Sequence, residues 1–548
     1  MPTNREAAEL FRSIADILDV LGERFKPEAY RRAARSIESL TEDLAAVATR
    51  NELRTIPGIG EAIEEKIREY LTTGHLAYYE RLQKEVPPGI LDLLRVPGLG
   101  PKTARRFWLE LGVEGPAELA DAIAKGRLTG VAGFGPKKVE QIRSALAAAA
   151  GPGAGQRLPI ETAYPVAQRL VAGLKAAGGV ERIELAGSFR RCRETVGDLD
   201  ILVTSSEPER VFDAFSRLPE VGEVRLRGGT KETVVLKQGL QVDLRVVEPA
   251  AFGAAWLYFT GSKDHNVHLR SIARDRGLKV NEYGIFRGEE RIGGRTEEEV
   301  YAALGLAWVP PEIREDRGEI DAAARGPLPP LVTAPELRGD LHCHLAPDAS
   351  ARDVDRLIAA ARARHLDYVG VVVAGVGSDG ARWTLSSAAL ARLDSARPPG
   401  VTVGRAREDA ANEDTSAADG PRSDYRILRP TRSSPGPPAR PPPSGEWTLA
   451  AHVGGDEAAR QWVPWARSAQ VALEVGPGPE RLDSTAARAA REARVALHVP
   501  TGVGLPEDDP LTPVALGFAR RSGAGPKDVK NTTRAADVTG AWARPKRA

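Results

Sequence analysis

A glycine turn followed by a strand that carries two carboxylates constrains this chain more than any other feature of its sequence. The turn is Gly187-Ser188-Phe189-Arg190-Arg191, and Asp198 and Asp200 alternate with apolar residues a few positions later. Side chains two residues apart on a strand point to the same face, so the two carboxylates project together. Asp243 lies in a second alternating run, and a turn at Gln238-Gly239 makes this run the return strand of a hairpin. Three carboxylates that converge in this way can hold two Mg²⁺ ions for an in-line phosphoryl or nucleotidyl displacement.

A different glycine turn recurs along the first part of the chain, and each copy precedes a helical pattern. The copies span residues 55–60, 96–102 and 131–138. Glycine lets such a turn expose backbone N–H groups, and the following helix directs its positive end to the same point, which gives a sequence-independent seat for phosphate. Three copies favour helix-hairpin-helix DNA binding over turns that only end one helix and open the next. A monovalent cation is a further candidate ligand of these turns. The expected DNA contacts are Gly58, Gly60, Gly98, Gly100, Lys102, Gly133, Gly135, Lys137 and Lys138.

The composition sets looser bounds on fold and partners. A chain of 548 residues is too long for one core, which predicts several domains. The formal net charge is only +1, so any contact with nucleic acid has to come from local basic patches. The cysteines, Cys192 and Cys343, cannot form a disulfide framework, and no apolar run approaches the ~18 residues of a membrane helix. We therefore expect a soluble, cytoplasmic monomer that associates with the nucleoid and with no membrane.

The turn and the three aspartates resemble the palm of the family X DNA polymerases. In that family the palm carries Gly-Ser-Phe-Arg-Arg, then Gly-Asp-x-Asp, then a strand Asp, and residues 187–191, 197–200 and 243 match this order. Tyr258-Phe259-Thr260-Gly261-Ser262 is similar to the segment that lines the incoming nucleotide, and residues 281–284 match the Asn-Glu-Tyr turn that follows it. Since three blocks agree in order and spacing, the resemblance is more specific than any one of them.

The resemblance implies a template-directed DNA polymerase that fills gaps during DNA repair, including base excision repair. Its substrates would be gapped or nicked DNA and deoxynucleoside triphosphates, and two Mg²⁺ or Mn²⁺ ions would bind to Asp198, Asp200 and Asp243. Ser188 and Arg191 would hold the β- and γ-phosphates. Two other functions stay open, a template-independent nucleotidyltransferase and a DNA-end-binding scaffold. The nucleotide site that the resemblance implies consists of Gly187, Ser188, Arg191, Tyr258, Phe259, Gly261, Asn266 and Arg270.

The N-terminal block also resembles the small lyase domain of this family. There a lysine on the helix after the first hairpin forms a Schiff base with an abasic sugar, and Lys66 stands at that position. A 5′-deoxyribose phosphate lyase is therefore a further expected activity. Only the neutral amine attacks an aldehyde, so the chemistry needs a partly desolvated or cation-crowded lysine. The alternative is an ion-paired surface lysine among Glu64, Glu65 and Glu69.

The C-terminal part resembles a PHP (polymerase and histidinol phosphatase) domain, a (β/α) barrel that supplies a metal-dependent nuclease in many bacterial members of the family. Gly339-Asp340-Leu341-His342-Cys343-His344 matches its opening, which places two imidazoles on one strand face. Most later ligands that the resemblance leads us to expect are absent, although Glu408 lies near the place of one, and only His342, His344 and His452 stand at family-like positions. Half-filled metal sites are costly to bury, so we expect a degenerate domain without nuclease activity. A residual mononuclear site at the three histidines is the alternative.

These assignments predict a multidomain α/β protein with an all-α helix-hairpin-helix region at its start. A Pro-rich, low-complexity stretch predicts an unstructured insertion at about residues 405–445. The expected parts are a lyase-like domain (1–80), a second, fingers-like helix-hairpin-helix domain (81–150), a linker (151–157), an α+β nucleotidyltransferase palm (158–250), a thumb-like small domain (251–320), a linker (321–335) and the degenerate PHP-like barrel (336–548).

Overall fold

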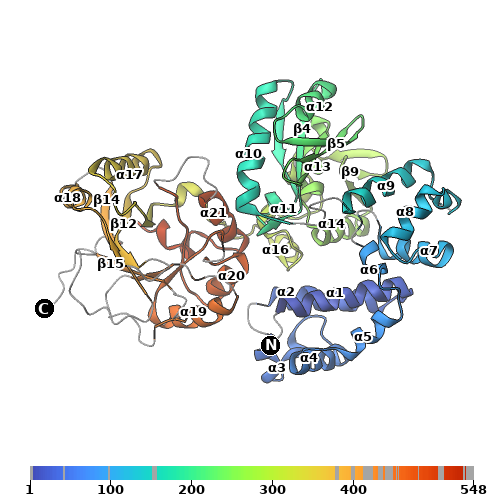
Figure 1. Ribbon diagram of the computed structural model, residues 1–548, viewed down its shortest axis with the longest axis horizontal. Helices are drawn as coiled ribbons and strands as arrows, with labels where there is room; N and C mark the ends of the chain where they lie inside the picture. The colour runs from blue at the N-terminus through green and yellow to red at the C-terminus, as the bar shows by residue number, and fades with distance from the viewer. Residues whose placement is uncertain are drawn as a thin grey trace. The chain divides into compact units, whose positions relative to one another are not determined.

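The computed structural model describes most of the chain, and the described residues form two compact units, Met1–Gln156 and Arg157–Ala548 (Figure 1). None of the described helices has the length and the apolar character that crossing a membrane requires. The residues outside the description are 1–3, 41–43, 95, 97–98, 132, 151–156, 377–381, 397–400, 411–423, 430–435, 439–447, 452, 454–455, 479–480, 504–510, 535–536 and 538–548.

The first unit contains helices and no strand in its described residues, as the all-α expectation requires. Apolar residues at helical spacing bury one face of each helix in a common core. In α4, for example, Ile63, Ile67 and Leu71 lie four residues apart and are all buried. The helices are α1 (Asn4–Leu21), α2 (Lys26–Ser39), α3 (Leu44–Thr49), α4 (Glu61–Thr73), α5 (Ala77–Lys84), α6 (Ile90–Leu93), α7 (Pro101–Leu111), α8 (Pro116–Ala124) and α9 (Pro136–Ala150), with short 3₁₀ turns at Leu53–Thr55 and Arg127–Gly130.

The second unit begins with a five-stranded sheet in the order β2-β4-β7-β6-β5. β4 and β7 pair in parallel, while the other neighbouring strands pair antiparallel. The strands are β2 (Arg182–Leu185), β4 (Asp198–Thr204), β5 (Val221–Arg227), β6 (Lys231–Leu236) and β7 (Gln241–Val246). Its helices are α10 (Ile160–Ala177), α11 (Gly187–Arg190) and α12 (Pro208–Ser216), and the short strands β1 (Leu158–Pro159) and β3 (Thr195–Val196) pair beside them.

A small domain follows, with a three-stranded antiparallel sheet in the order β10-β9-β8. Side chains cap two of its helices: Ser262 accepts a hydrogen bond from the His265 amide, and Thr296 accepts one from the Glu299 amide. Ile320 and Ala323 of α16 pack in the core of this domain, so part of the predicted linker 321–335 is helical. The elements are α13 (Phe252–Thr260), α14 (Lys263–Asp275), β8 (Leu278–Asn281), β9 (Gly284–Arg287), β10 (Glu290–Gly293), α15 (Glu297–Ala303) and α16 (Glu319–Arg325), with 3₁₀ turns at Pro249–Ala251 and Pro311–Ile313.

The C-terminal region is built on an eight-stranded sheet, in which seven strands follow one another in parallel as β11-β12-β14-β15-β16-β17-β18. This succession gives a nearly closed, barrel-like sheet, and the near-continuous apolar run of β12 is typical of a parallel strand buried on both faces. The strands are β11 (Gly339–Cys343), β12 (Tyr368–Val376), β13 (Arg382–Thr384), β14 (Thr402–Ala410), β15 (Tyr425–Arg429), β16 (Thr448–Ala450), β17 (Ala472–Glu474) and β18 (Leu497–His498). The helices are α17 (Ala351–Ala363), α18 (Ser387–Ser395), α19 (Asp456–Ala469), α20 (Ser484–Glu492) and α21 (Leu511–Arg521), with 3₁₀ turns at Ala334–Glu336, Pro526–Asp528 and Lys530–Thr532.

The expectation of unstructured chain across residues 405–445 is wrong at two places. Residues 405–410 belong to β14 and residues 425–429 form β15, which pairs with β14 in parallel. Tyr425 and Ile427 are fully buried, because β15 lies inside the sheet rather than at its edge. The charged residues of β14 and the Pro-rich sequence that follows β15 concealed these strands. The central Pro-rich residues themselves lie mostly outside the described residues.

The palm and the C-terminal region share one apolar core. Phe189, Leu199 and Phe212 from the palm belong to the same cluster of buried side chains as Trp462 and Phe518 from the C-terminal region. Val332, in the connection between them, is also buried in this cluster. The two regions are therefore packed against each other through apolar side chains, as the interior of a single compact unit is.

Candidate active site

The three predicted aspartates lie on two adjacent strands of the palm sheet. Asp198 is the first residue of β4, and Asp200 follows two positions later on the same face. β7 runs parallel to β4, and its Asp243 is the direct register partner of Asp200. The predicted hairpin exists, since β6 and β7 pair antiparallel on either side of the Gln238-Gly239 turn. The structure thus brings together the three carboxylates that the sequence singles out.

Burial and repulsion from neighbouring carboxylates oppose the ionisation of Asp198 and Asp200. Burial and the charges of Asp198 and Asp243 raise the pKa of Asp200 to about 7. Burial and the charge of Asp243 also raise the pKa of Asp198. The site therefore contains more negative charge than the neighbouring cations neutralise. Carboxylate oxygens are also the ligands that Mg²⁺ and Mn²⁺ prefer. These residues fit a divalent cation site.

Side chains of β6 and β7 hold the Asp243 carboxylate in place. Its Oδ1 accepts a hydrogen bond of 2.8 Å from the Thr233 hydroxyl. Its Oδ2 lies 2.6 Å from Nζ of Lys231 and 3.4 Å from Nη2 of Arg245. The side chain is only 9% exposed, so its orientation is fixed by these contacts rather than by solvent. Sequence reasoning did not single out these residues, although Thr233 is the register partner of Asp243, Arg245 lies two residues from it, and Lys231 is the register partner of Arg245.

Proton release should accompany the binding of a divalent cation to the aspartates. Since the pKa of Asp200 is raised from 3.8 to about 7, Asp200 holds a proton at about pH 6 that a cation has to displace. We expect the Mg²⁺ affinity to fall as the pH drops below about 7, with release of about one proton per site at about pH 6 and little at about pH 8. Calorimetric titration in buffers of different ionisation enthalpy measures this number. Asp200→Asn removes the titrating group and should abolish the release; an unchanged release would assign the proton elsewhere.

The raised pKa also predicts how the metal-free protein responds to pH. The folded chain binds the Asp200 proton more tightly than the unfolded chain does, so Asp200 contributes a stability that decreases as the pH rises from about 4 to about 7. A bound divalent cation reverses this trend, because it favours the ionised carboxylate.

Gly187 allows the turn of α11 to approach these carboxylates. Its φ is +63°, and a Cβ atom at this position would lie 2.6 Å from Oδ2 of Asp200. The amide of Ala186 donates a hydrogen bond of 2.9 Å to the carbonyl oxygen of Asp200, which fixes the turn against β4. Ser188, the predicted phosphate ligand, therefore directly follows the glycine that packs against Asp200.

The two arginines of the turn connect the palm to the small domain. Arg190 forms two hydrogen bonds, of 2.6 and 2.9 Å, to the carboxylate of Glu297. Arg191 is 13% exposed: its Nε donates to Oε1 of Glu315 over 3.0 Å, and its Nη1 donates to the carbonyl oxygen of Thr260. To hold a phosphate, Arg191 has to exchange one anion, Glu315, for another. No local pattern in the sequence indicates this ion pair, because Glu315 lies 124 residues further along the chain.

The Tyr-Phe-Thr-Gly-Ser block forms the end of α13 and the turn into α14. Tyr258 and Phe259 are half-buried and their rings meet edge to face at 5.1 Å, while the guanidinium of Arg245 lies 4.2 Å from the Phe259 ring centre. Since Arg245 also lies next to Asp243, it joins this block to the aspartates. A Cβ atom on Gly261 would lie 3.2 Å from Nη1 of Arg191, so glycine leaves room for that arginine.

Asn266 and Arg270 lie on α14, four residues apart, and so on one face of the helix. The side-chain amide of Asn266 donates a hydrogen bond of 2.7 Å to the carbonyl oxygen of Tyr258. Nε of Arg270 donates to the carbonyl oxygen of Asn266 over 3.3 Å. Both side chains are thus directed along the helix toward the Tyr-Phe-Thr-Gly-Ser block, and their roles toward DNA stay predictions.

In the first unit, the glycine turns have a conformation that leaves room for a phosphate group. Gly58 and Gly133 have φ of +85° and +86°, where a side chain would be strained. Gly60 and Gly100 are the residues directly before α4 and α7, and a Cβ atom on either, or on Gly135, would meet nothing within 4 Å. The first N–H groups of these helices are therefore accessible to an approaching anion.

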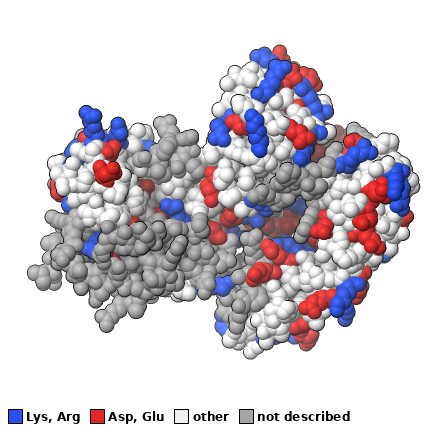
Figure 2. All heavy atoms as spheres, viewed as in Figure 1, with Lys and Arg blue, Asp and Glu red and all other residues white. Residues whose placement is uncertain are grey.

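The expected lysines at these turns are partly described. Lys102 and Lys138 are exposed, and Nζ of Lys138 lies 4.2 Å from the centre of the Phe134 ring. Gly98 and the side chain of Lys137 lie outside the described residues. On the face drawn in Figure 2, acidic and basic side chains are interspersed over the described part of this unit. Contact with DNA would thus depend on the local turns, in line with the net charge of +1.

Lys66 is half-buried on α4, next to an aromatic pair. Its Nζ donates a hydrogen bond of 2.9 Å to the carbonyl oxygen of Ala62 and lies 4.8 Å from the centre of the Tyr78 ring. The guanidinium of Arg81 lies 5.1 Å from the same ring, which stacks on Tyr30. Among the described residues no carboxylate forms an ion pair with Lys66, so the alternative of an ion-paired surface lysine is wrong here.

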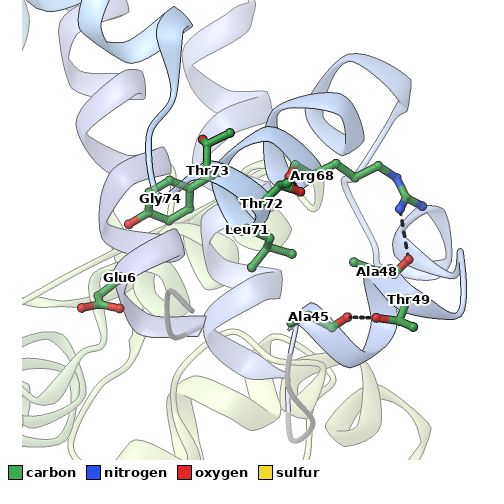
Figure 3. Close-up of a pocket in the computed structure, with 10 residues that line it drawn as sticks. Glu6, Ala45, Ala48, Thr49, Arg68, Leu71, Thr72, Thr73 and Gly74 are labelled. Atoms are coloured by element: carbon green, nitrogen blue, oxygen red, sulfur yellow. Dashed lines mark hydrogen bonds between the residues drawn. The ribbon is translucent and has the colours of Figure 1, made fainter.

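An open hollow of about 900 Å³ lies in the same unit, between α1, α3 and α4 (Figure 3). Arg68 crosses it, and its Nη1 donates a hydrogen bond of 3.0 Å to the carbonyl oxygen of Ala48. Neither Lys66 nor a residue of the glycine turns lines it. The hollow is therefore separate from the lysine and from the expected DNA contacts.

A second cluster of metal-ligating side chains lies in the C-terminal sheet. Ligand atoms of His342, His344 and Glu408 all lie within 4.8 Å of one another. The Nε2 atoms of the two histidines are 2.9 Å apart, and Nε2 of His344 lies 3.8 Å from Oε2 of Glu408. Imidazole nitrogens this close can share a proton or a metal cation. His452, the third expected histidine, lies outside the described residues.

Sequence reasoning found the two histidines of this cluster and missed the carboxylates beside them. Glu408, left out of the expected ligand set, comes beside the histidines, and His342 Nδ1 lies 2.8 Å from Oε2 of Glu474. His498 lies 3.3 Å from Glu474 and 3.4 Å from Asp340, and these two carboxylates outweigh burial and raise its pKa to about 9. The missed signal is position: Glu474 and His498 are the last residues of β17 and β18, and the carboxyl ends of parallel strands meet at one edge of a sheet.

Three known sequence families match parts of this chain. The DNA polymerase beta thumb matches residues 255–315, which contain the Tyr-Phe-Thr-Gly-Ser block and Glu315. A helix-hairpin-helix domain matches residues 2–76, and a SAM-like helix-hairpin-helix tandem matches residues 90–148. The matches support DNA binding by the first unit.

Known proteins that match more than half of this chain agree with these families. DNA polymerase/3'-5' exonuclease PolX of Bacillus subtilis (strain 168) is 33% identical over 372 residues, which cover 67% of this chain and 64% of that protein. DNA polymerase lambda of Rattus norvegicus is 26% identical over 345 residues (57% of this chain and 56% of that protein), and its namesake from Arabidopsis thaliana is 27% identical over 346 residues (57% and 62%). The matched stretch thus spans between 56% and 64% of the length of these relatives. Together with the aspartate geometry, these similarities show that the chain belongs to the family X DNA polymerases.

Proposed function

We propose that this chain is a template-directed DNA polymerase that fills gaps in DNA during repair. The observation that carries the proposal is the parallel register of β4 and β7, which puts Asp243 beside Asp200 and two residues from Asp198, with the Gly187 turn against them. Divalent ions held by these aspartates would supply the charge that favours the primer 3′-oxyanion and the leaving pyrophosphate. The monomeric state, nucleoid association, a monovalent cation at the turns and the choice between Mg²⁺ and Mn²⁺ stay predictions.

The side chains around the aspartates have distinct proposed tasks. Lys231 and Arg245 fix the Asp243 carboxylate and limit the repulsion between it and Asp200. Ser188 and Arg191 bind the triphosphate, and Arg191 leaves Glu315 to do so. Tyr258 and Phe259 pack the sugar of the incoming nucleotide. Because the chemistry consists largely of positioning and charge neutralisation, each task is one of geometry.

The test is primer extension on DNA with a one-nucleotide gap and a 5′-phosphate, in Mg²⁺ or Mn²⁺, with Asp198→Ala for comparison. Incorporation that follows the template and requires Asp198 supports the proposal. Extension of a single strand without template would favour the template-independent nucleotidyltransferase. DNA binding without incorporation in either metal would favour the DNA-end-binding scaffold.

A second proposed activity is the removal of a 5′-deoxyribose phosphate by Lys66. It is supported by the cationic surroundings of the amine, since Arg81 lies over the same Tyr78 ring and no carboxylate is paired with Lys66 among the described residues. We expect borohydride to trap a covalent adduct between the protein and an abasic 5′ end. Lys66→Ala should abolish the adduct, whereas Lys84→Ala, which removes an exposed lysine of the same unit, should not. An adduct that survives Lys66→Ala would assign the chemistry to another amine.

For the C-terminal region we propose a residual site for one divalent ion and no nuclease activity. His342, His344 and Glu408 offer ligands for one cation, which supports the residual mononuclear site in a modified form. We expect purified protein to retain about one equivalent of Zn²⁺ or Mn²⁺ and to lose it on His344→Ala, as metal analysis would measure. A Mn²⁺-dependent 3′-exonuclease activity that disappears on His342→Ala would contradict the proposed loss of the nuclease.

A further inference from the structure

A helix of the C-terminal region packs directly on the chain that links the nucleotide turn to the aspartate strand. α21 passes so close to this chain that a Cβ atom on Gly517 would lie 2.4 Å from Sγ of Cys192. Val514 and Phe518 of the same helix belong to the apolar cluster that contains Phe189 of the turn. Close-packed side chains transmit small displacements, so the last turn of α21 is mechanically connected to the nucleotide site.

Arg521, the last residue of α21, enters the ion-pair network around Arg191. Arg521 is 3% exposed, and its Nη1 donates to Oε1 of Glu315 over 2.8 Å. Arg191 donates to the same oxygen atom over 3.0 Å. Nη1 of Arg521 also lies 3.3 Å from the carbonyl oxygen of Arg191 and 3.2 Å from that of Glu312. One carboxylate oxygen is thus shared between the C-terminal region and the arginine that is expected to bind phosphate.

The carboxylate at the centre of this network is ionised. Burial opposes its ionisation, but the charges of Arg521 and Arg191 outweigh burial and hold the pKa of Glu315 at about 2. Arg193 adds a third cation, with its Nη1 3.6 Å from Oε2 of Glu315. Because a carboxylate oxygen has only two lone pairs, Arg521 and Arg191 compete as donors for Oε1 of Glu315.

We propose that Arg521 is a positioning residue for nucleotide binding, which acts by sharing Glu315 with Arg191. The inference rests on the proposed polymerase function and on the phosphate-binding role of Arg191. When Arg521 occupies Oε1 of Glu315, Arg191 can exchange that anion for the triphosphate at a lower cost. Without Arg521, the carboxylate holds Arg191 more tightly and the incoming nucleotide binds more weakly. The C-terminal region in this way sets the nucleotide affinity of the palm.

The test is a set of variants measured by single-nucleotide gap filling. Arg521→Gln keeps a side chain that can donate to the two carbonyl oxygens but removes the charge. We expect it to raise the KM for the incoming nucleotide about tenfold and to change kcat less than about threefold, since the aspartates are untouched. Arg521→Lys keeps the charge and should stay within about twofold of the wild type.

The double variant Arg521→Gln/Glu315→Gln separates positioning from folding. It removes one cation and one anion, so the network stays balanced in charge, and Arg191 loses the carboxylate that restrains it. Its KM should return to the wild-type value or fall below it. If Arg521→Gln alone does not fold, this double variant still tests the inference, because a raised KM in it would contradict the proposed sharing of Glu315.

Arg520 supplies the matched control. It is the neighbouring residue of α21 and pairs with Glu312 at 2.7 Å, so Arg520→Gln breaks an ion pair of the same helix end. Its hydrogen bonds go to Glu312 and to the carbonyl oxygen of Val332 and not to Arg191 or Glu315. We expect Arg520→Gln to leave the KM unchanged. An equal rise of the KM in both single variants would overturn the inference in favour of a general loosening of α21.

An equilibrium measurement keeps this inference distinct from the proposed function. Binding of a fluorescent deoxynucleoside triphosphate in Ca²⁺ is measured without turnover. If the wild type binds the triphosphate but incorporates nothing, the proposed function fails, while the affinities of the variants still decide the inference. The same affinity in the wild type and in Arg521→Gln, or no triphosphate binding by the wild type, overturns it.

Discussion

Asp243→Asn should abolish nucleotide incorporation and leave DNA binding intact. The substitution keeps the shape of the side chain and its hydrogen bond from Thr233, but it removes the negative charge that faces Asp200 across the two strands. A divalent ion at this site is worth several kcal/mol of charge stabilisation, so we expect kcat for gap filling to fall by about 10³-fold or more. DNA affinity should change little, because the glycine turns of the first unit lie in a different compact unit.

The comparison for this variant is Asp213→Asn. Asp213 is a half-exposed carboxylate of the same palm on α12, and it pairs with Arg227 at 2.8 Å. Losing a surface ion pair of this kind costs about 0–1 kcal/mol of stability and should leave incorporation unchanged. Gap filling and DNA binding measured side by side distinguish the two variants. Turnover retained by Asp243→Asn would refute its assignment as a metal ligand.

Glu297→Gln should destabilise the second unit more than any surface substitution. The carboxylate is 3% exposed and accepts five hydrogen bonds: two from Arg314 and two from Arg190 over 2.6–2.9 Å, and one from Nε1 of Trp308 over 3.1 Å. Burial opposes its ionisation, but Arg314 and Arg190 hold the pKa of Glu297 well below its usual range. A neutral amide leaves two buried guanidinium groups without a counter-charge, which costs about 3–5 kcal/mol. Denaturant unfolding measures this loss.

The neighbour Glu298 provides the matched control for this measurement. It is exposed on the first turn of the same helix, so Glu298→Gln should change the stability by no more than about 0.5 kcal/mol. Because the folded pKa of Glu297 is depressed, the contribution of its charge is present above the unfolded value of 4.5 and is lost only as the pH falls far below it. Similar unfolding midpoints for the two variants would show that the Glu297 network adds no net stability.

The sequence predicts well those features that depend on the alternation of residues along a strand or on a local turn. The alternation around Asp198, Asp200 and Asp243 places the carboxylates on one face, and the Gln238-Gly239 turn fixes the hairpin that joins them. The glycine turns of the first unit are predictable for the same reason, since the positive φ of Gly58 and Gly133 strongly favours glycine. In these cases the signal and the structure lie within a few residues of each other.

Contacts between distant segments are not predictable in this way. Glu315 comes to Arg191 and Arg521 from 124 and 206 residues away, and a glutamate in a charged stretch gives no local sign of burial. The strands β14 and β15 were hidden for a different reason, because residues 405–410 of β14 are mostly charged and β15 is a short strand followed directly by Pro-rich sequence. His342, Glu408, Glu474 and His498 come from the strands β11, β14, β17 and β18, so only the topology of the parallel sheet places them together.

The common core of the palm and the C-terminal region decides where this chain can be cut. A fragment that ends after the small domain would lose Trp462, Val514 and Phe518, and it would expose the palm side chains that they cover to water. Such a fragment is expected to aggregate, although it carries every residue of the nucleotide site. A minimal polymerase made from this protein therefore needs the C-terminal strands and helices to complete its apolar core. This requirement does not depend on what the histidine cluster does.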